Sequence, residues 1–323
     1  MSAGSARRAL RRSSSALGFM LCVAWPFAAS AAEPLGLGAV ARPVPLDGPW
    51  LVRTPAEAKV QFRGLASFED AAIGPHGMVY PAPNLIGFLA AIAVHGAISG
   101  SVQDKKQAAI REAADKVLVS YQPVLDTLSH TTLMPAALAK TARGGPKRHV
   151  AEGEHAHQWV IESVPVFSMT QDQRALVLDN AFVVRAPEKD APVVYRNVVR
   201  VVTRPLPAGD EKSPVSEAWL AEDGRRLREQ SIELLGESID LMFGELARGP
   251  GAPEEREQKT VRYPEGGAIR MERASPLAER CDRVVLKTLR GWVMSVPRLQ
   301  AIGTDCNEPE SVPKSAVAAA SSP

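Results

Sequence analysis

The sequence predicts an α+β fold: a mainly antiparallel sheet of about five or six strands, with one long central helix and a second helix packed on one face. Three observations lead to this prediction. β-Branched runs occupy residues 158–168, 175–184 and 193–203, and the linkers between them are too short for crossover helices. An apolar stretch within residues 84–120 is typical of a long helix. A second apolar stripe at helical spacing follows the three β-branched runs.

The first 31 residues have the composition of a secretory signal. Four arginines precede an apolar segment from Ala16 to Ala29, and Ala29-Ser30-Ala31 is a typical cleavage site. Cleavage near Ala31 predicts a periplasmic or secreted protein, whereas an uncleaved segment would remain as a membrane anchor. The remaining chain has 34 basic and 36 acidic residues and therefore a net charge of −2. This charge, without any basic patch, argues against a nucleic-acid partner.

Composition also sets the expected domain boundaries. Residues 32–55 are rich in Pro and Gly, which predicts an irregular, exposed leader. Residues 56–304 hold the predicted helices and strands, beginning with a strand within 58–68, and are expected to form a single α+β domain. Residues 307–323 are polar and rich in alanine, which is typical of a disordered tail.

The uncharged stretch from Leu85 to Val102 is the expected centre of the fold. Its small residues recur at helical spacing and therefore share one face; they are Ala93, Gly96, Ala97 and Gly100. Three interpretations remain open: a buried core helix, a membrane-inserted helix of about 27 Å, and self-association through the small-residue face. The apolar stripe continues among charged residues to about residue 120, which favours the core helix over membrane association.

The three β-branched runs are expected to pair as an antiparallel meander, after a short helix at residues 135–140. In the third run, the side that carries Tyr195 and Val199 is the more apolar and is expected to face the core. Pro165 indicates an edge strand or a bulge in the first run. Asp179-Asn180 interrupts the second run, which predicts a bulge or turn, or a carboxylate that pairs with His157.

The C-terminal third predicts one more helix and a hairpin. Asp223 is a possible N-cap for a helix that runs to about Ala247 and ends at Gly249-Pro250. The helix has the apolar stripe of a segment that covers a sheet; the stripe is Ile232, Leu235, Ile239, Met242 and Leu246. Residues 264–267 are expected to form a hairpin turn, and residues 283–294 the last strand.

Two cysteines, Cys281 and Cys306, remain after removal of the signal segment. In an oxidising compartment such a pair predicts a disulfide, and the alternative is two buried thiols. Closing a loop of about 25 residues contributes roughly 3 to 4 kcal/mol of stability in the chain-entropy model.

A metal site is predicted less specifically by the histidine-rich segment that precedes the first β-branched run. His155 and His157 share one face of a strand, and Glu154 lies beside them as a possible carboxylate ligand. The spacing matches no established metal motif, so a polar loop that enters a strand is the alternative.

The sequence has no phosphate-binding loop, no dinucleotide fingerprint and no nucleophile elbow, and we predict no cofactor. By elimination, these observations favour a non-enzymatic envelope protein that acts by binding another envelope protein or by self-association. A hydrolase with an unrecognised site is the first alternative. A metal-binding or membrane-associated periplasmic protein is the second.

Overall fold

The structure is a computed structural model, and it describes residues 36–66, 102–150, 157–188, 192–210, 213–251 and 257–300. Contacts between Cα atoms divide the chain into two units, Met1–Glu33 and Pro34–Pro323, and every described residue belongs to the second. The predicted signal segment, the small-residue face at 93–100 and the tail at 307–323 lie outside the described residues.

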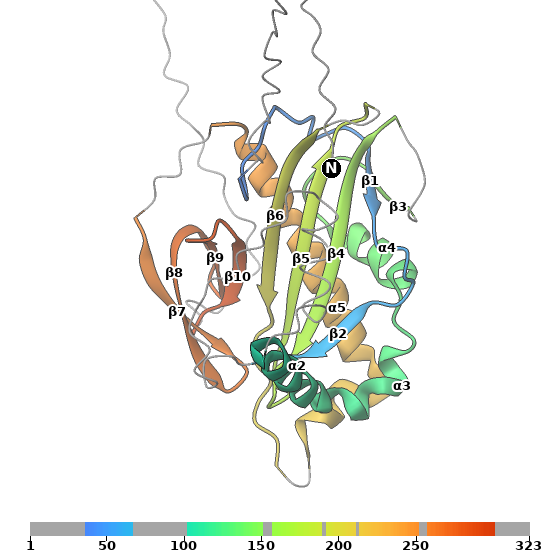
Figure 1. The fold of residues 1–323 in the computed structure, drawn as a ribbon, viewed down its shortest axis with the longest axis vertical. Coiled ribbons are helices and arrows are strands. Elements are labelled where there is room, and N and C mark those ends of the chain that lie inside the picture. Colours follow the sequence, from blue (N-terminus) through green and yellow to red (C-terminus); the bar gives the residue numbers. More distant parts are fainter. Residues whose placement is uncertain are drawn as a thin grey trace, which may run out of the picture. The chain divides into compact units, whose positions relative to one another are not determined.

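Ten strands form one mostly antiparallel sheet, which confirms the α+β class and exceeds the predicted five or six strands (Figure 1). The strands are β1 (Trp50–Arg53), β2 (Gln61–Gly64), β3 (Lys147–Val150), β4 (Trp159–Met169), β5 (Leu176–Arg185), β6 (Val193–Val202), β7 (Lys259–Glu265), β8 (Ala268–Glu279), β9 (Arg283–Thr288) and β10 (Val293–Pro297). Their order is β3-β1-β4-β5-β6-β10-β9-β8-β7, and β2 also pairs with β4. The predicted meander is confirmed as β4-β5-β6.

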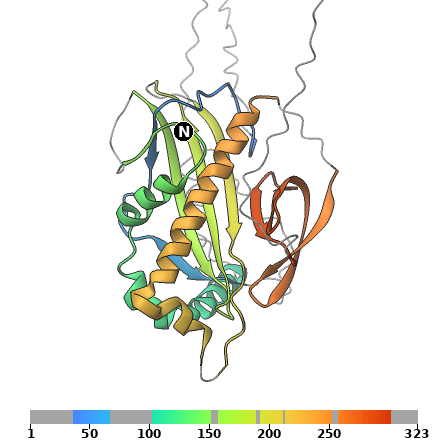
Figure 2. The same ribbon diagram turned by 180° about the vertical axis from the view of Figure 1, so that it is seen from behind.

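One long helix, α5, crosses the sheet on a single face (Figure 2). The described helices are α2 (Val102–Asp115), the 3-10 helix η1 (Lys116–Tyr121), α3 (Gln122–Leu125), α4 (His130–Lys140) and α5 (Val215–Arg248). The long helix predicted at 84–120 is described only from Val102, as α2 followed by η1, so the rest of that prediction lies outside the described residues. Within the described residues α5 covers the sheet, because its apolar stripe is continuous.

The predicted end of this helix is confirmed, and a helical segment begins directly after Asp223-Gly224, but at a kink within α5 and not at an N-cap. Gly249 ends α5 in the left-handed region at φ +73°. Helical geometry is interrupted from Ala221 to Gly224, and Asp223, predicted as the N-cap, lies inside this kink at φ +53°. A Cβ at Gly224 would overlap the Val124 side chain, so the kink needs glycine for both its φ and its close approach to α3.

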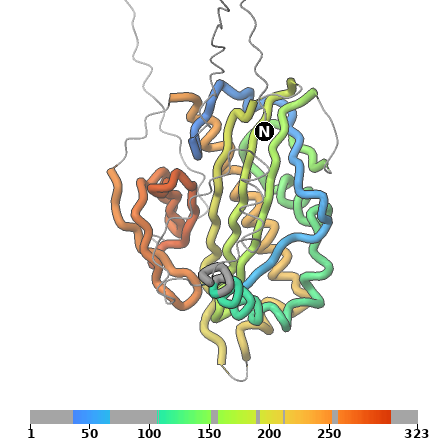
Figure 3. Tube along the Cα trace, in the orientation of Figure 1, coloured from blue at the N-terminus to red at the C-terminus, as the bar shows by residue number. Residues whose placement is uncertain are grey.

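The predicted leader at 32–55 is wrong where it is described, because it contains a buried strand. Trp50, at the start of β1, is 1% exposed, and β1 lies parallel to both β3 and β4. Upstream, Val40 forms an antiparallel bridge with Tyr195 of β6. Figure 3 follows this segment, in blue, from the side of β6 to the side of β4. The Pro and Gly residues therefore serve turns between paired stretches.

Pro165 lies inside the sheet rather than at an edge or a bulge. β1 pairs with the first part of β4, at Trp159–Glu162, and β2 pairs with the last part, at Val166–Met169. Pro165 lies in the gap between these two partners. On that side no strand is present to accept a hydrogen bond, so the N–H that proline lacks is not needed. The two short strands together explain how a central strand tolerates proline.

Two further local predictions are refined. The helix predicted at 135–140 begins earlier, at His130, because the Ser129 and Thr132 side chains form a capping box. The hairpin predicted at 264–267 is confirmed, with Gly266 at φ +63° between β7 and β8. The last predicted strand, 283–294, is instead two antiparallel strands, β9 and β10, because the chain reverses before Gly291 at φ +83°.

The central strands bury both of their faces. Toward α5, Phe182, Tyr195 and Val199 pack with the helix stripe, as predicted for the third run. On the opposite face, Val177 and Val202 pack in a second core with side chains of the C-terminal strands; these are Tyr263, Ala274, Val284, Leu286, Met294 and Val296. Among the described helices, none has the length and apolar character needed to cross a membrane.

Candidate ligand-binding groove

A cleft of about 940 Å³ lies at the C-terminal end of α5. One wall is the N-terminal stretch 36–40, which lies against β6. A second wall is the end of α5, with Glu245 and Arg248, and the third is formed by β8 and β9. Cavities of this size hold small molecules or parts of peptides.

A second cavity of about 540 Å³ adjoins the first. It lies between the end of α4, the flank of α5 and the strands β8 to β10. Three residues line both cavities: Glu245, Arg248 and Leu277. We call the two cavities together the groove. It follows β8 past the last turns of α5.

Glu245, at the junction of the two cavities, is the most unusual polar group of the groove. It is 3% exposed, and its Oε1 atom pairs with the Arg248 guanidinium. Its Oε2 atom is buried and accepts no hydrogen bond. A buried carboxylate oxygen without a donor carries a large desolvation cost, and such atoms often mark functional sites. Oε2 is therefore a buried acceptor of the groove that lacks a hydrogen-bond donor.

Glycine lets the N-terminal stretch pass close to Glu245. Gly38 has φ +73°, and a Cβ there would lie 3.0 Å from Asn197 Nδ2 and 3.4 Å from Glu245 Oε2. Asn197 Nδ2 donates a hydrogen bond to the Gly291 carbonyl oxygen at 3.0 Å, which ties β6 to the turn before β10. Burial raises the pKa of the neighbouring Tyr195 hydroxyl, against the opposing effects of Asn197 and Arg248. This corner of the groove is therefore closely packed.

The other acids of the groove have their own partners. Glu233 pairs with Lys140, and Glu237 pairs with Arg283 and Ser295. The carboxylate of Asp240 accepts hydrogen bonds from the backbone N–H groups of residues 142 and 143, just after α4. Their charges are therefore used in holding α4, α5 and the C-terminal strands together.

Two arginines of the groove lack such a partner. Arg273 lines the first cavity and Arg280 lines the second, and both are exposed. Neither side chain forms an ion pair or hydrogen bond in the part of the chain that the structure describes. The groove thus offers two unused cations on either side of Glu245.

The opposite face of the sheet holds a second buried carboxylate, in which both oxygens are bonded. Asp179 Oδ1 accepts from Arg200 Nε at 2.6 Å, and Oδ2 accepts from Arg200 Nη2 at 2.8 Å. Arg63 lies 3.7 Å from Oδ2 and also donates to Ser168. The Arg200 guanidinium lies 5.7 Å from the centre of the Trp292 ring. This arrangement is complete without a ligand, and we assign it to the architecture.

Sequence reasoning missed this pairing. Asp179 and Asn180 form no bulge or turn but lie in a continuous ladder with β4 and β6. Successive strand residues point to opposite faces, so Asp179 meets Arg200 while Asn180 donates to Ser238 of α5. Glu245 had one detectable signal: it lies three positions after Met242, beside the buried stripe of its helix.

The predicted disulfide is described at one end. Cys281 is disulfide-bonded, and its partner lies outside the described residues, so the pairing with Cys306 stays a prediction. Of the predicted metal ligands, His157 is exposed just before β4, whereas Glu154 and His155 lie outside the described residues. Across the described ranges, no three His, Cys, Asp or Glu side chains are grouped as a metal site would require.

A histidine within reach of a hydroxyl, as in hydrolases with an activated hydroxyl nucleophile, does occur at the edge of the sheet. His149 Nε2 lies 3.0 Å from Thr54 Oγ1. Thr54 is 5% exposed, and neither residue lines the groove. The pair therefore joins β3 to the end of β1 and gives no support to catalysis in the groove.

Comparison with protein-family models, with curated proteins and with solved structures finds no match to this chain.

Proposed function

We propose that this chain is a non-enzymatic protein of the cell envelope, periplasmic or secreted, that binds a segment of a partner protein in the groove. The single observation that supports the binding role is Glu245, which lines both cavities and whose buried Oε2 atom accepts no hydrogen bond. The groove also suits a chain segment better than a compact small molecule, because its two cavities meet at Glu245 and continue along β8.

Envelope localisation rests on the sequence alone. The basic, apolar and small-residue parts of the first 31 residues support export. Sequencing the N-terminus of the chain purified from its native cells tests this. We expect the mature chain to start at Ala32, and a cytosolic chain that retains Met1 would contradict export.

Site-specific photocrosslinking tests the binding role. Leu289 lines the first cavity and is 58% exposed, whereas Val119 of η1 is 70% exposed and lines neither cavity. A photoreactive residue at 289 should give a discrete adduct in the native envelope, and the same residue at 119 should not. No adduct from 289, or the same adducts from both positions, would contradict binding in the groove.

A further inference from the structure

We propose that the partner segment is an extended acidic peptide, with one acidic group near each end of the bound stretch and an apolar residue between them. This inference rests on the proposed function and deepens it. It follows from the order of groups along the groove, which is an unpaired arginine, then Glu245 with Leu277, then a second unpaired arginine.

The two ends of the groove are cationic. Arg273 and Arg280 are exposed and have no acidic partner among the described residues, whereas Glu233, Glu237 and Asp240 are already bonded. A guanidinium presents parallel N–H donors that match a carboxylate. Each end therefore favours an anionic group from the partner.

The spacing of these arginines fits a peptide. Arg273 lies in the middle of β8 and Arg280 follows its last residue, seven positions later, which corresponds to at most about 23 Å of extended chain. The register of β8 shifts between Pro276 and Ala278, which shortens this span. An extended segment of about six residues covers the distance. Leu277, which lines both cavities at the midpoint, offers an apolar contact to the central residue of such a segment.

The middle of the groove favours a neutral donor instead of an anion. Glu245 Oε2 needs a hydrogen-bond donor, and the C-terminal end of α5 carries the negative end of the helix dipole. An ammonium group is disfavoured because Arg248 already pairs with the same carboxylate. A peptide N–H is a neutral donor of the required kind, and it occurs at every residue of an extended chain except proline.

Binding of short fluorescent peptide pools to the mature chain tests the inference. One pool carries aspartate at both ends and leucine in the middle, a second carries asparagine in place of aspartate, and a third is the aspartate pool with an amidated C-terminus. We expect the aspartate pool to bind about tenfold more tightly than the asparagine pool, because complementary charges face the groove. Amidation separates the two sources of carboxylate. If the groove binds the aspartate side chain, amidation of the C-terminus leaves binding unchanged. If the groove binds the terminal carboxylate, amidation abolishes binding.

Charge reversal locates the contact. Arg273→Glu and Arg280→Glu should each weaken binding of the aspartate pool about tenfold, because like charges then face each other. Arg262→Glu is the matched control, since Arg262 is an exposed arginine on β7 that lines neither cavity. Equal binding of the first two pools, no binding of either, or equal weakening by all three substitutions would overturn the inference.

The crosslinking experiment separates this inference from the proposed function. If the adduct from position 289 persists undiminished in the chain with both Arg273→Glu and Arg280→Glu, the groove binds a partner of different chemistry. The proposed function then stands and the acidic peptide is wrong. If the unsubstituted chain gives no adduct from position 289, the proposed function itself fails.

Discussion

Asp179 lies on β5, inside the sheet, and Glu245 lies near the end of α5; both are buried carboxylates beside an arginine. Asp179 is 6% exposed and Glu245 is 3% exposed. Both oxygens of Asp179 accept hydrogen bonds from Arg200, and Arg63 adds a second cation. Only one oxygen of Glu245 has a partner, and the other is buried without one in a residue that lines a cavity.

In this chain, the number of hydrogen bonds that a buried carboxylate accepts distinguishes a structural ion pair from a binding site. Burying a charge is costly unless all of its hydrogen-bonding positions are used. Asp179 meets this condition within the fold, and the cations around it need its charge. Glu245 does not meet it, and Arg248, with a side chain 37% exposed, can turn to solvent. A buried carboxylate whose oxygens all accept hydrogen bonds thus has a structural role. A buried carboxylate with an unused oxygen, in a residue that lines a cavity, marks the groove.

Asp179→Asn should lower the stability of the chain more than any other substitution considered. The substitution keeps the shape of the side chain but leaves the partly exposed Arg200 and Arg63 without their shared counter-charge. The free energy of unfolding should therefore fall by about 3 kcal/mol, the lower end of the range for breaking a buried pair. Urea unfolding at neutral pH measures the change. The control is Glu188→Gln, because Glu188 also accepts two hydrogen bonds from one arginine, Arg42, but on an exposed surface. Equal losses in the two variants would show that burial does not set the value of the pair.

The strands and the helix that carry Asp179 and Glu245 were easier to predict from the sequence than the contacts that these two residues make. The β-branched runs and the stripe of α5 are local signals, so the strands β4 to β6 and the end of the helix at Gly249 were predictable. The partner of Asp179 is 21 residues away on the next strand, and its register depends on the pairing of the whole meander. Residue types alone therefore gave no reason to choose Arg200 over His157.

The N-terminal stretch was unpredictable for a related reason. Its Pro and Gly content is the usual signal of an irregular leader. β1 has only four residues, and it is buried because β3, β4 and α5 surround it, as the edge-on contact between Trp50 and Phe243 of α5 shows. Gly38 and Glu245 lie more than two hundred positions apart in the sequence and meet only in the folded chain. No local pattern reveals such a site.

His130 is a third kind of buried polar group, one that stays uncharged in the folded chain. Its contribution to stability can be tested by lowering the pH. Burial, and then the charge of His149, lower the pKa of His130 from 6.5 to about 4, while Glu57 opposes them. Below about pH 6.5 the unfolded chain takes up a proton that the folded chain does not. Stability from this residue is therefore fully present above pH 6.5 and is lost as the pH falls toward 4. Between pH 7 and pH 5 the loss should be about 2 kcal/mol.

Urea unfolding of the unsubstituted chain and of His130→Gln at both pH values checks this expectation. Burial also lowers the pKa of His149, which adds a loss of the same sign, so the informative quantity is the difference between the two chains. The variant should lose less stability on acidification. Identical losses would mean that His130 takes up its proton equally well in the folded and unfolded chains.

A smaller effect is expected for Glu245→Gln, which makes the same carboxylate-to-amide change as Asp179→Asn. The free energy of unfolding should change by less than about 1 kcal/mol, because the lost pairing with Arg248 is offset by removing an unsatisfied buried charge. Binding should respond more strongly. If the amide oxygen stays on Arg248, the NH₂ group faces the ligand and repels its N–H donor.

Urea unfolding of Asp179→Asn and Glu245→Gln in parallel, with anisotropy measurements on the aspartate peptide pool, decides between the two roles. We expect a large loss of stability in the first variant and a loss of peptide affinity without unfolding in the second. Equal destabilisation would mean that Glu245 is as structural as Asp179, and the groove would lose the observation that identifies it.

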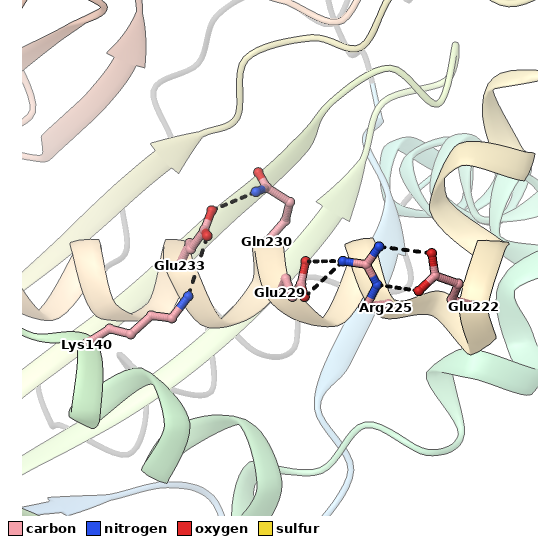
Figure 4. A network of polar contacts seen from close by, with 6 residues as sticks. All are labelled: Lys140, Glu222, Arg225, Glu229, Gln230 and Glu233. Atoms are coloured by element: carbon pink, nitrogen blue, oxygen red, sulfur yellow. Dashed lines mark hydrogen bonds and ion pairs between the residues drawn. The ribbon is translucent and has the colours of Figure 1, made fainter. Parts of the chain in front are cut away.

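Removing an exposed ion pair on α5 should change the stability least. Arg225 makes two hydrogen bonds to Glu222 and reaches Glu229, while Lys140 pairs with Glu233 further along the helix (Figure 4). This network resembles the Asp179 pair in geometry but lies in water, where side-chain entropy and solvent screening cancel most of the attraction. Arg225→Ala should therefore leave the urea midpoint unchanged within error, at low and at high salt. A clear loss that high salt suppresses would show that hydrogen-bond geometry, and not burial, determines what an ion pair contributes in this chain.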